Sequence, residues 1–228
     1  MSEFFKNVRS LIRIKGILNA YIKWIFSRAM EKNGPRMQYL GSSKLKLGEW
    51  ISFSEYWTFQ GVVPDREQKL VNTMAAKSLS ENNTPVAFDV GANIGAFSLM
   101  LASQGFSTHA FEPIPETFFR LKKNLAYNKL LKKTSLNCFA LSDFEGIVEF
   151  TVDDIAPATN RFLAPDMTVT GINTYKQNVA GMTIDHYCER FGIRSIDFLK
   201  IDVEGMEPLV LRGARNLLKR KAVSTVLI

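Results

Sequence analysis

The chain has 228 residues, of which 46% are hydrophobic and 22% are charged, an ordinary globular composition that excludes a disordered or fibrous chain. Its length suits one sizeable α/β core with an N-terminal appendage and is too short for two ordinary domains with a long linker. Residues 1–50 carry 10 Lys and Arg against 3 Glu, whereas residues 51–228 carry 19 basic and 19 acidic residues. Because nucleic-acid binding needs clustered basic side chains, the neutral core argues against that class of partner.

Residues 3–31 have the spacing of a basic amphipathic helix, with Lys or Arg between the apolar positions. We assign this helix to an N-terminal segment, residues 1–35, which Gly34 and Pro35 end. Its apolar face either packs on the core or contacts a membrane surface or a partner. Polar residues interrupt the apolar run, so the pattern indicates neither a signal peptide nor a spanning helix. We expect a cytoplasmic protein, with peripheral membrane contact as the alternative.

Residues 36–83 form a lead-in or lid segment, in which 37–62 favours strands and 64–80 a helix. From residue 84 onward, strands and helices alternate. The predicted strands are 86–90, 107–112, 135–141, 147–152, 196–203 and 222–228, the predicted helices are 96–104, 116–133, 184–191 and 206–220, and 153–182 is less regular. Such alternation implies parallel strands with right-handed crossovers, so residues 84–228 are predicted to form a doubly wound, mostly parallel, Rossmann-like α/β sheet.

Two turns at the carboxyl ends of neighbouring strands carry the strongest functional signal. In the stretch VAFDVGANIGAFS, residues 86–98, a strand runs through Asp89 into Gly91 and Gly95 and then into a helix. Such sheets bind ligands outside the carboxyl ends of their strands, where glycines let the backbone approach and the helix offers free amides to an anion. Glu112 ends the next strand, 21 residues after Gly91, a spacing that suits a carboxylate bound to two ribose hydroxyls.

Asn93 distinguishes between adenosine-containing ligands. A dinucleotide fingerprint, G-x-G-x-x-G, has its second glycine here so that a pyrophosphate can touch the backbone, but this chain reads G-A-N-I-G. A ligand with ribose at one end and an amino acid at the other, S-adenosylmethionine, suits the loop better. A nicotinamide-dependent oxidoreductase is the weaker alternative, since it shares Glu112 but is disfavoured by Asn93.

Residues 84–228 resemble the FkbM-type methyltransferases in four segments, which occur in the same order and at similar spacing. The segments are FDVGANIGAFS, FEPIPETFFRLKKNLAYN, ALSDFEG and IDFLKIDVEGMEPLVLRGA. The resemblance implies a Class I methyltransferase fold, S-adenosylmethionine as the methyl donor, and a hydroxyl acceptor on a sugar, a lipid-linked glycan or a secondary metabolite. It also implies which residues hold each part of the cofactor: Asp89, Gly91, Asn93 and Gly95 the methionine end, Glu112 the ribose, and Ser142 with Asp143 the adenine.

Asp202 and Glu204 are the candidate catalytic residues. They stand two apart after an apolar strand, so both point to the cofactor edge if the chain stays extended. Methyl transfer to oxygen needs the acceptor's proton to be removed, and a carboxylate can act as that base. We predict Asp202 as the base and Glu204 as its partner or as an acceptor-positioning residue. Alternatively the two acids orient the loop or cap helix 206–220; a metal site is disfavoured because no His or third acid stands beside them.

Other polar residues are interpreted as structural. Lys200 lies inside a strand and cannot be buried without a partner, so it should reach a polar group at the strand edge. His109, inside an apolar strand, and His186, one turn into a helix, are predicted to have structural roles. Cys138 and Cys188 are predicted to be buried thiols, because their spacing supports neither a disulfide framework nor a zinc site.

The irregular stretch 153–182 is the expected acceptor-contacting loop, because it is polar and lies near the predicted active edge; a surface excursion without a substrate role is the alternative. Its candidate contacts are Thr159, Asn160, Arg161, Asn173 and Tyr175.

The last predicted strand, 222–228, is apolar and has no cap after it. We expect either a domain shortened at its C-terminal end or another element that covers this strand edge, and an uncovered edge would promote self-association. A third interpretation of the whole chain is a membrane-attached binding module that kept the fold and lost the chemistry.

Overall fold

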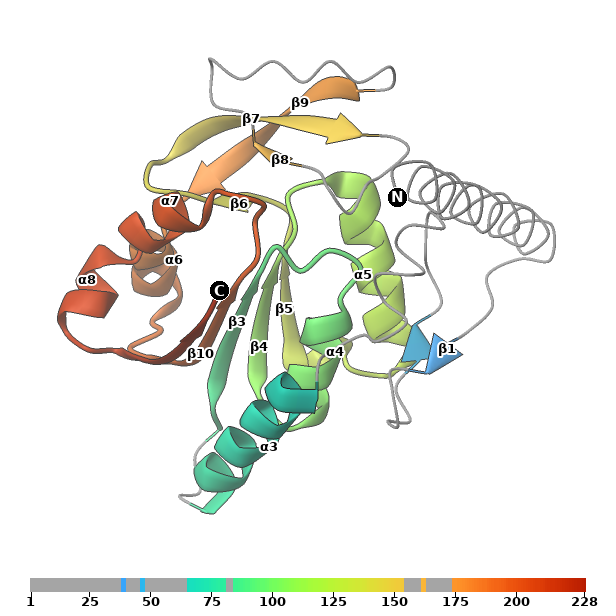
Figure 1. Ribbon diagram of the computed structural model, residues 1–228, viewed down its shortest axis with the longest axis vertical. Coiled ribbons are helices and arrows are strands. Elements are labelled where there is room, and N and C mark those ends of the chain that lie inside the picture. Colours follow the sequence, from blue (N-terminus) through green and yellow to red (C-terminus); the bar gives the residue numbers. More distant parts are fainter. Residues whose placement is uncertain (1–37, 40–45, 48–64, 81–83, 154–160, 163–173) are drawn as a thin grey trace, which may run out of the picture.

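A computed structural model describes residues 38–39, 46–47, 65–80, 84–153, 161–162 and 174–228. Figure 1 shows a central sheet with helices on both sides and a smaller sheet across one end. The helix predicted over residues 3–31 lies outside the described residues. Of the strands predicted within 37–62, the structure describes β1 (Gln38–Tyr39) and β2 (Lys46–Leu47), which pair antiparallel.

Among the described residues, the central sheet has five parallel strands in the order β11–β10–β3–β4–β5. They are β3 (Val86–Val90), β4 (Ser107–Phe111), β5 (Thr134–Asn137), β10 (Ile196–Ile201) and β11 (Val223–Leu227). The chain starts in the middle with β3, adds β4 and β5 on one side, and then returns to add β10 and β11 on the other. This order confirms the predicted doubly wound, Rossmann-like fold, in which ligands bind where the order reverses, next to β3 and β10.

Helices cover both faces of this sheet. In the described part of the chain they are α3 (Asp65–Ser80), α4 (Ala96–Ser103), α5 (Pro115–Tyr127), α6 (Ile184–Phe191), α7 (Glu207–Arg212) and α8 (Arg215–Lys219). None of these helices is long and apolar enough to cross a membrane. The helix predicted over 116–133 is shorter than expected, because α5 is followed by a bend at Lys129, with a φ of 59°, and then by the 3₁₀ turn η1 (Leu131–Lys133).

The helix predicted over 206–220 is divided into α7 and α8. The break falls at Gly213 and Ala214. A Cβ atom at Gly213 would lie 2.0 Å from the carbonyl oxygen of Ser142, so glycine lets this turn approach the end of a neighbouring strand. The break therefore brings the α7–α8 turn against the predicted adenine-binding segment.

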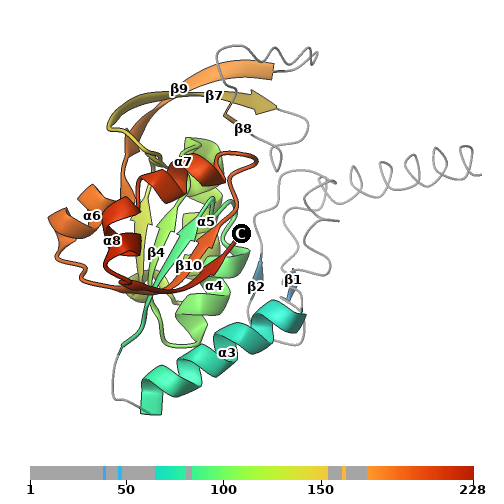
Figure 2. The same ribbon diagram turned by 60° about the vertical axis from the view of Figure 1, so that its left-hand side comes forward.

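A second sheet has the strand order β6–β9–β7–β8. Its strands are β6 (Ala140–Leu141), β7 (Gly146–Asp153), β8 (Arg161–Phe162) and β9 (Thr174–Met182). The prediction of one strand over 135–141 is wrong, because this stretch contributes to β5 of the central sheet and to β6 of the second. The prediction that 153–182 is irregular is also wrong over 174–182, where residues 174–181 of β9 pair antiparallel with β7 and Met182 pairs in parallel with Leu141 of β6. Figure 2 shows the second sheet lying across the end of the central sheet.

Aromatic side chains anchor helices on both faces of the central sheet. On one face, the rings of Phe88 and Phe111 contact the ring of Tyr187 in α6, and their centroids lie 5.6 and 4.9 Å from the Tyr187 centroid, respectively. On the other face, Phe198 stacks on Phe97 of α4 at 6.0 Å. Because these residues lie on or next to the strands that end at the predicted ligand edge, packing on both sides holds that edge in place.

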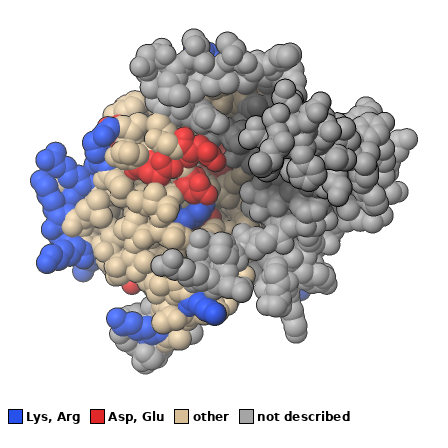
Figure 3. Space-filling model, viewed as in Figure 1, with Lys and Arg blue, Asp and Glu red and all other residues tan. Residues whose placement is uncertain are grey.

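Charge is unevenly distributed over the described surface. In Figure 3, acidic side chains gather in the middle of the face, near the turn between β10 and α7, where Asp202 and Glu204 are exposed. Basic side chains gather at the left-hand edge, where α6, α8 and their adjoining turns lie. The exposed basic residues of these segments are Arg190, Arg194, Arg215, Lys219, Arg220 and Lys221. The predicted active edge is therefore mainly acidic, with one small basic patch beside the acidic one, and the larger basic group lies away from it.

Candidate active site

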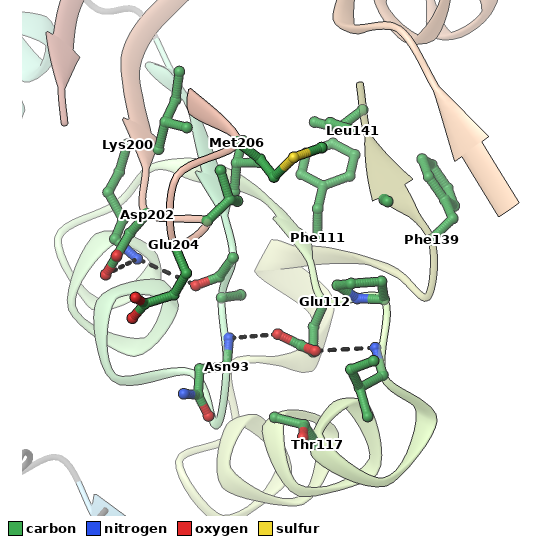
Figure 4. A pocket seen from close by; sticks show the side chains of 18 of the residues that line it. Asn93, Phe111, Glu112, Thr117, Phe139, Leu141, Lys200, Asp202, Glu204 and Met206 are labelled. Carbon is green, nitrogen blue, oxygen red and sulfur yellow. Dashed lines mark hydrogen bonds and ion pairs between the residues drawn. The ribbon is translucent and has the colours of Figure 1, made fainter. Parts of the chain in front are cut away.

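A cavity of about 470 Å³ opens at the carboxyl edge of the central sheet, on the side of the second sheet (Figure 4). Its walls come from the turn after β3, the ends of β4 and β10, and strands β6 and β7. Six of the nine predicted site residues line it: Gly91, Asn93, Glu112, Ser142, Asp202 and Glu204. The other three, Asp89, Gly95 and Asp143, do not line it.

The glycine turn after β3 is shaped by packing against the protein itself. Gly91 and Gly95 have φ angles of 75° and 94°, which other residues rarely adopt. A Cβ atom at Gly91 would lie 1.9 Å from the carbonyl oxygen of Asp202, and one at Gly95 would lie 2.5 Å from Cδ1 of Leu121. The turn therefore needs glycine at both positions because it packs closely against the end of β10 and against α5. The sequence analysis had instead explained these glycines by the close approach of a ligand.

Asn93 occupies the middle of this turn with a left-handed backbone, at a φ of 50°. Its backbone N–H donates to Oε2 of Glu112 at 3.0 Å. The side-chain oxygen Oδ1 is buried and has no hydrogen-bond partner among the described residues. Because Asn93 lines the cavity, rotation of its side chain would offer this oxygen to a donor on a bound molecule.

Glu112 follows β4 and is buried, with 7% of its surface exposed. Its two carboxylate oxygens accept the N–H groups of Asn93 and Ile114, both at 3.0 Å. Burial raises the pKa of Glu112 to about 7, although these hydrogen bonds and nearby Lys200 act in the opposite direction. The carboxylate joins two turns and faces the cavity (Figure 4), where each oxygen keeps a lone pair for another donor.

Asp89 is fully buried inside β3 and supports the turn from within the fold. Its Oδ2 accepts a hydrogen bond from Ser98 Oγ at 2.6 Å, and its Oδ1 lies 3.2 Å from Lys200 Nζ. The prediction that Lys200 has a polar partner is therefore confirmed, and the structure identifies Asp89 as one such partner. Burial alone would lower the pKa of Lys200, but the charges of Asp89 and Asp202 outweigh it and raise that pKa, so the side chain stays an ammonium.

Asp202 and Glu204 line one wall of the cavity, but the prediction that both extend from a strand is wrong. β10 ends one residue before Asp202, and Glu204 lies in a left-handed turn with a φ of 52°. Glu207 holds this turn, since its Oε1 accepts the N–H groups of Val203 and Gly205 at 3.1 and 3.2 Å. The turn, rather than strand alternation, brings both acids to the cavity (Figure 4).

Ser142 and Asp143 follow β6 and diverge. Ser142 is buried and lines the cavity, whereas Asp143 Oδ2 pairs with Nε of Arg212 in α7 at 3.0 Å. The hydroxyl of Ser142 donates to Asp143 Oδ1 at 3.3 Å. Asp143 thus connects the cavity wall to α7, and the adenine contact of both residues stays a prediction.

The apolar walls of the cavity were missed by the sequence analysis. They include Phe139, Leu141, Val148, Phe150 and Met206. Val148 and Phe150 lie two apart on β7, so the alternation of this strand marks one apolar face. No local signal shows that this face covers a cavity of another sheet, because the coverage depends on how the two sheets pack.

The acceptor contacts predicted between residues 153 and 182 are only partly described. Arg161 begins β8, and Tyr175 lies in β9 with 43% of its surface exposed. Thr159, Asn160 and Asn173 lie outside the described residues. An acceptor-contacting role for this stretch stays a prediction.

Both histidines have the predicted structural roles. His109 is buried in β4 with Nδ1 2.9 Å from the hydroxyl of Tyr187, and burial lowers its pKa to about 4, so the ring is neutral. The backbone N–H of His186 donates to Thr183 Oγ1 at 3.1 Å, so Thr183 caps α6, and the imidazole ring of His186 contacts Glu145. Neither histidine lines the cavity.

Of the two cysteines, Cys188 is buried as predicted, but Cys138 is exposed, and that prediction is wrong. Cys138 lies in the connection between β5 and β6, where the chain leaves one sheet for the other. Within the ranges that the structure describes, no group of three or more His, Cys, Asp or Glu side chains could hold a metal ion.

A family model described as the methyltransferase FkbM domain matches residues 89–228, a range that contains all nine predicted site residues. The chain belongs to the FkbM methyltransferase family. A solved structure of the SAM-dependent methyltransferase from Agrobacterium tumefaciens matches 74% of this chain and 39% of that chain, with a TM-score of 0.42 and 12% identity. Both the TM-score and the identity are too low to support a further conclusion.

Curated relatives of this FkbM-family chain have names that describe methyl transfer. The 31-O-demethyl-FK506 methyltransferase FkbM of Streptomyces tacrolimicus is 33% identical over 159 residues, 58% of this chain and 60% of the relative. The hexuronic acid methyltransferase AglP of Haloferax volcanii is 25% identical over 169 residues, 74% of this chain and 64% of the relative. The 2-O-methyltransferase NoeI of Sinorhizobium fredii is 26% identical over 163 residues, 63% of each chain. The chain therefore spans less than two thirds of the length of these relatives.

Proposed function

We propose that this FkbM-family protein transfers a methyl group from S-adenosylmethionine to a hydroxyl group of a sugar, a glycan or a secondary metabolite. The observation that carries the proposal is the placement of buried Glu112 and of the acids Asp202 and Glu204 around one cavity. The reaction needs a carboxylate that can hold a ribose and a second carboxylate that can accept a proton. These carboxylates follow β4 and β10, the two strands that flank β3.

The lining residues fit S-adenosylmethionine in three respects. Glu112 keeps lone pairs for the two ribose hydroxyls. The unpaired Oδ1 of Asn93 can accept a hydrogen bond from the ammonium group at the methionine end. Phe139 and Leu141 offer an apolar wall to the adenine, as purine sites commonly do. These residues would hold the three parts of the cofactor in one cavity.

Bound S-adenosylmethionine would supply a methyl group on a sulfonium, whose S–C bond breaks as the acceptor oxygen bonds to the methyl carbon, with the thioether S-adenosylhomocysteine as the leaving group. The acceptor hydroxyl must lie in line with that methyl group and lose its proton as the O–C bond forms. We assign removal of the proton to the Asp202 carboxylate and positioning of the acceptor to Glu204. Both are exposed to the cavity beside the glycine turn, and Asp202 lies against Gly91 of that turn.

The relatives support a hydroxyl acceptor on a sugar or a secondary metabolite. Two of their names specify transfer to oxygen, and the third specifies a hexuronic acid. A nicotinamide-dependent oxidoreductase has less support, because Asn93 carries a side chain where a dinucleotide site needs a glycine. As for partners, we propose that the protein does not bind nucleic acid and that residues 1–35 make peripheral contact with a membrane. We also propose self-association through β11, which forms one edge of the described central sheet.

Calorimetric titration with S-adenosylmethionine, S-adenosylhomocysteine and NAD tests the proposal. We expect the first two to bind and NAD not to bind, followed by methyl transfer to at least one member of a panel of sugar, glycan and polyketide hydroxyls. Binding of NAD alone would overturn the assignment. Binding of S-adenosylmethionine without turnover on the whole panel would instead favour a non-catalytic binding module.

A further inference from the structure

Lys200 and Asp89 form a charged pair in the middle of the parallel sheet. They are direct neighbours in the register of β10 and β3. Their side chains are 12% and 0% exposed, and Nζ of Lys200 lies 3.2 Å from Oδ1 of Asp89. A buried ammonium is costly unless it is paired and hydrogen-bonded, so a lysine in this place needs several acceptors.

The ammonium of Lys200 has two more acceptors, and both belong to the candidate active site. It donates to the carbonyl oxygen of Gly91 at 3.2 Å and lies 3.5 Å from Oδ2 of Asp202. It also lies 5.6 Å from the centre of the Phe97 ring, which closes off the side toward α4. One cation therefore contacts the glycine turn after β3 and the candidate base after β10.

Asp202 depends on this contact for the direction of its side chain. The side chain is 66% exposed, and Lys200 is the ion-pair partner that the described structure provides for it. Figure 4 shows the ammonium lying between the Asp202 carboxylate and the turn that carries Asn93. An exposed carboxylate without such a partner would sample several rotamers, only some of which face an acceptor.

The turn depends on the same contact for the direction of one peptide group. The N–H groups of Gly91 and Ala92 both donate to the carbonyl oxygen of Phe111 at 3.0 Å, and the Gly91 carbonyl points to Lys200. The peptide group at the start of the turn is thus held from both sides. A change at Lys200 should alter the turn and the base together.

We propose that Lys200 is a positioning residue for methyl transfer, whose ammonium fixes the Asp202 carboxylate and the Gly91 turn relative to each other. This inference rests on the proposed function. Backbone contacts already hold Asp202 against the turn after β3, and Lys200, which lines the cavity from β10, sets the direction of the Asp202 carboxylate relative to that turn. Small displacements matter here, since a shift of about 1 Å can lower a rate about 100-fold.

The test uses Lys200→Met, Lys200→Arg and Asp202→Asn, with the exposed Lys219→Met of α8 as the matched control. We expect Lys200→Met to lower kcat about 100-fold and to weaken S-adenosylmethionine binding less than about 10-fold by calorimetry. Lys200→Arg keeps the positive charge and should restore part of kcat. Lys219→Met should behave as the unaltered protein.

A double-mutant cycle decides whether Lys200 acts through Asp202. We expect Lys200→Met to cost little further kcat in the Asp202→Asn background, because the base that it positions is already lost. Full additivity of the two effects would overturn the inference. Hydrogen exchange of the protein without ligand provides a readout independent of activity: amides of residues 91–95 should exchange faster in Lys200→Met, and unchanged exchange there would also overturn it.

Lys200→Met leaves Asp89 buried without a cation, so the variant can fail to fold. The double variant Asp89→Asn with Lys200→Met removes both charges. If Lys200→Met does not fold, the double variant takes its place in every comparison, and Asp89→Asn alone takes the place of the unaltered protein. Failure of the unaltered protein to bind S-adenosylmethionine would overturn the proposed function together with this inference. Normal activity in the Lys200 variants would overturn this inference alone.

Discussion

The buried carboxylate of Glu112 accepts the backbone N–H of Asn93 at 3.0 Å, and this hydrogen bond joins the turn after β3 to the turn after β4. The second carboxylate oxygen binds the N–H of Ile114, so one side chain fixes both turns. The two loops proposed to hold the methionine end and the ribose of the cofactor are therefore one structural unit. Loss of the carboxylate should affect both.

Glu112→Ala should weaken S-adenosylmethionine binding about 100-fold or more, because each hydrogen bond to a charged group contributes about 1.5–3 kcal/mol and two ribose contacts are lost. Isothermal titration calorimetry measures the change. The control is Glu116→Ala, which removes an exposed carboxylate of α5 that pairs with Arg120. Equal affinities of Glu112→Ala and the unaltered protein would refute the ribose assignment.

The raised pKa of Glu112 predicts a pH dependence of stability. Its pKa is about 7 in the folded protein and 4.5 ordinarily, so the folded protein binds this proton more tightly than the unfolded chain does. Its contribution to stability is complete below pH 4.5 and is lost as the pH rises to about 7. Relative to Glu112→Gln, the free energy of unfolding should fall by about 2–3 kcal/mol over that interval.

Urea denaturation of both proteins at a series of pH values measures this difference. His109, whose pKa is lowered to about 4, acts with the opposite sign: its contribution is lost as the pH falls from 6.5 to about 4. Because His109 is present in both proteins, its contribution cancels. A difference that stays constant between pH 4.5 and 7 would show that Glu112 keeps an ordinary pKa.

Asp202→Asn should keep the affinity for S-adenosylmethionine and lower kcat about 100-fold or more, because an amide cannot take up the acceptor's proton. The affinity should persist since the Asp202 side chain is directed toward Lys200 and solvent rather than toward Glu112. Single-turnover methyl transfer measures the chemical step, and Glu149→Gln on the exposed face of β7 is the control. An unchanged kcat would remove Asp202 as the base.

Gly91→Ala should destabilise the protein strongly. The new Cβ atom would meet the Asp202 carbonyl oxygen at 1.9 Å, and the φ of 75° is strained for alanine, so we expect a loss of about 2–5 kcal/mol. Gly192→Ala has a similar φ of 67° but meets nothing within 4 Å, and should cost about 1–2 kcal/mol. Denaturant unfolding compares the two. Equal losses would mean that backbone strain, and not the close approach of β10, requires glycine at position 91.

The sequence alone determined the alternation of strands and helices that builds the central sheet from residue 84 onward. The strands at 86–90 and the helix at 184–191 appear where the sequence predicts them, because apolar periodicity and caps act within a few neighbouring residues. The strand predicted over 135–141 and the irregular stretch ending at 182 failed for the same physical reason. Whether such residues pair is decided by partners far along the chain, as when residues 174–181 pair with residues 146–153.

The candidate site divides in the same way. The spacing of Gly91, Asn93 and Glu112 was readable because each follows a strand end, and parallel strands bring their carboxyl ends together. Only the tertiary structure decided that Lys200 contacts Asp202 and the Gly91 carbonyl, and that β7 supplies an apolar wall. The contact of Lys200 with Gly91 joins residues 109 positions apart, and β7 belongs to another sheet, so both features exist only once the core has packed.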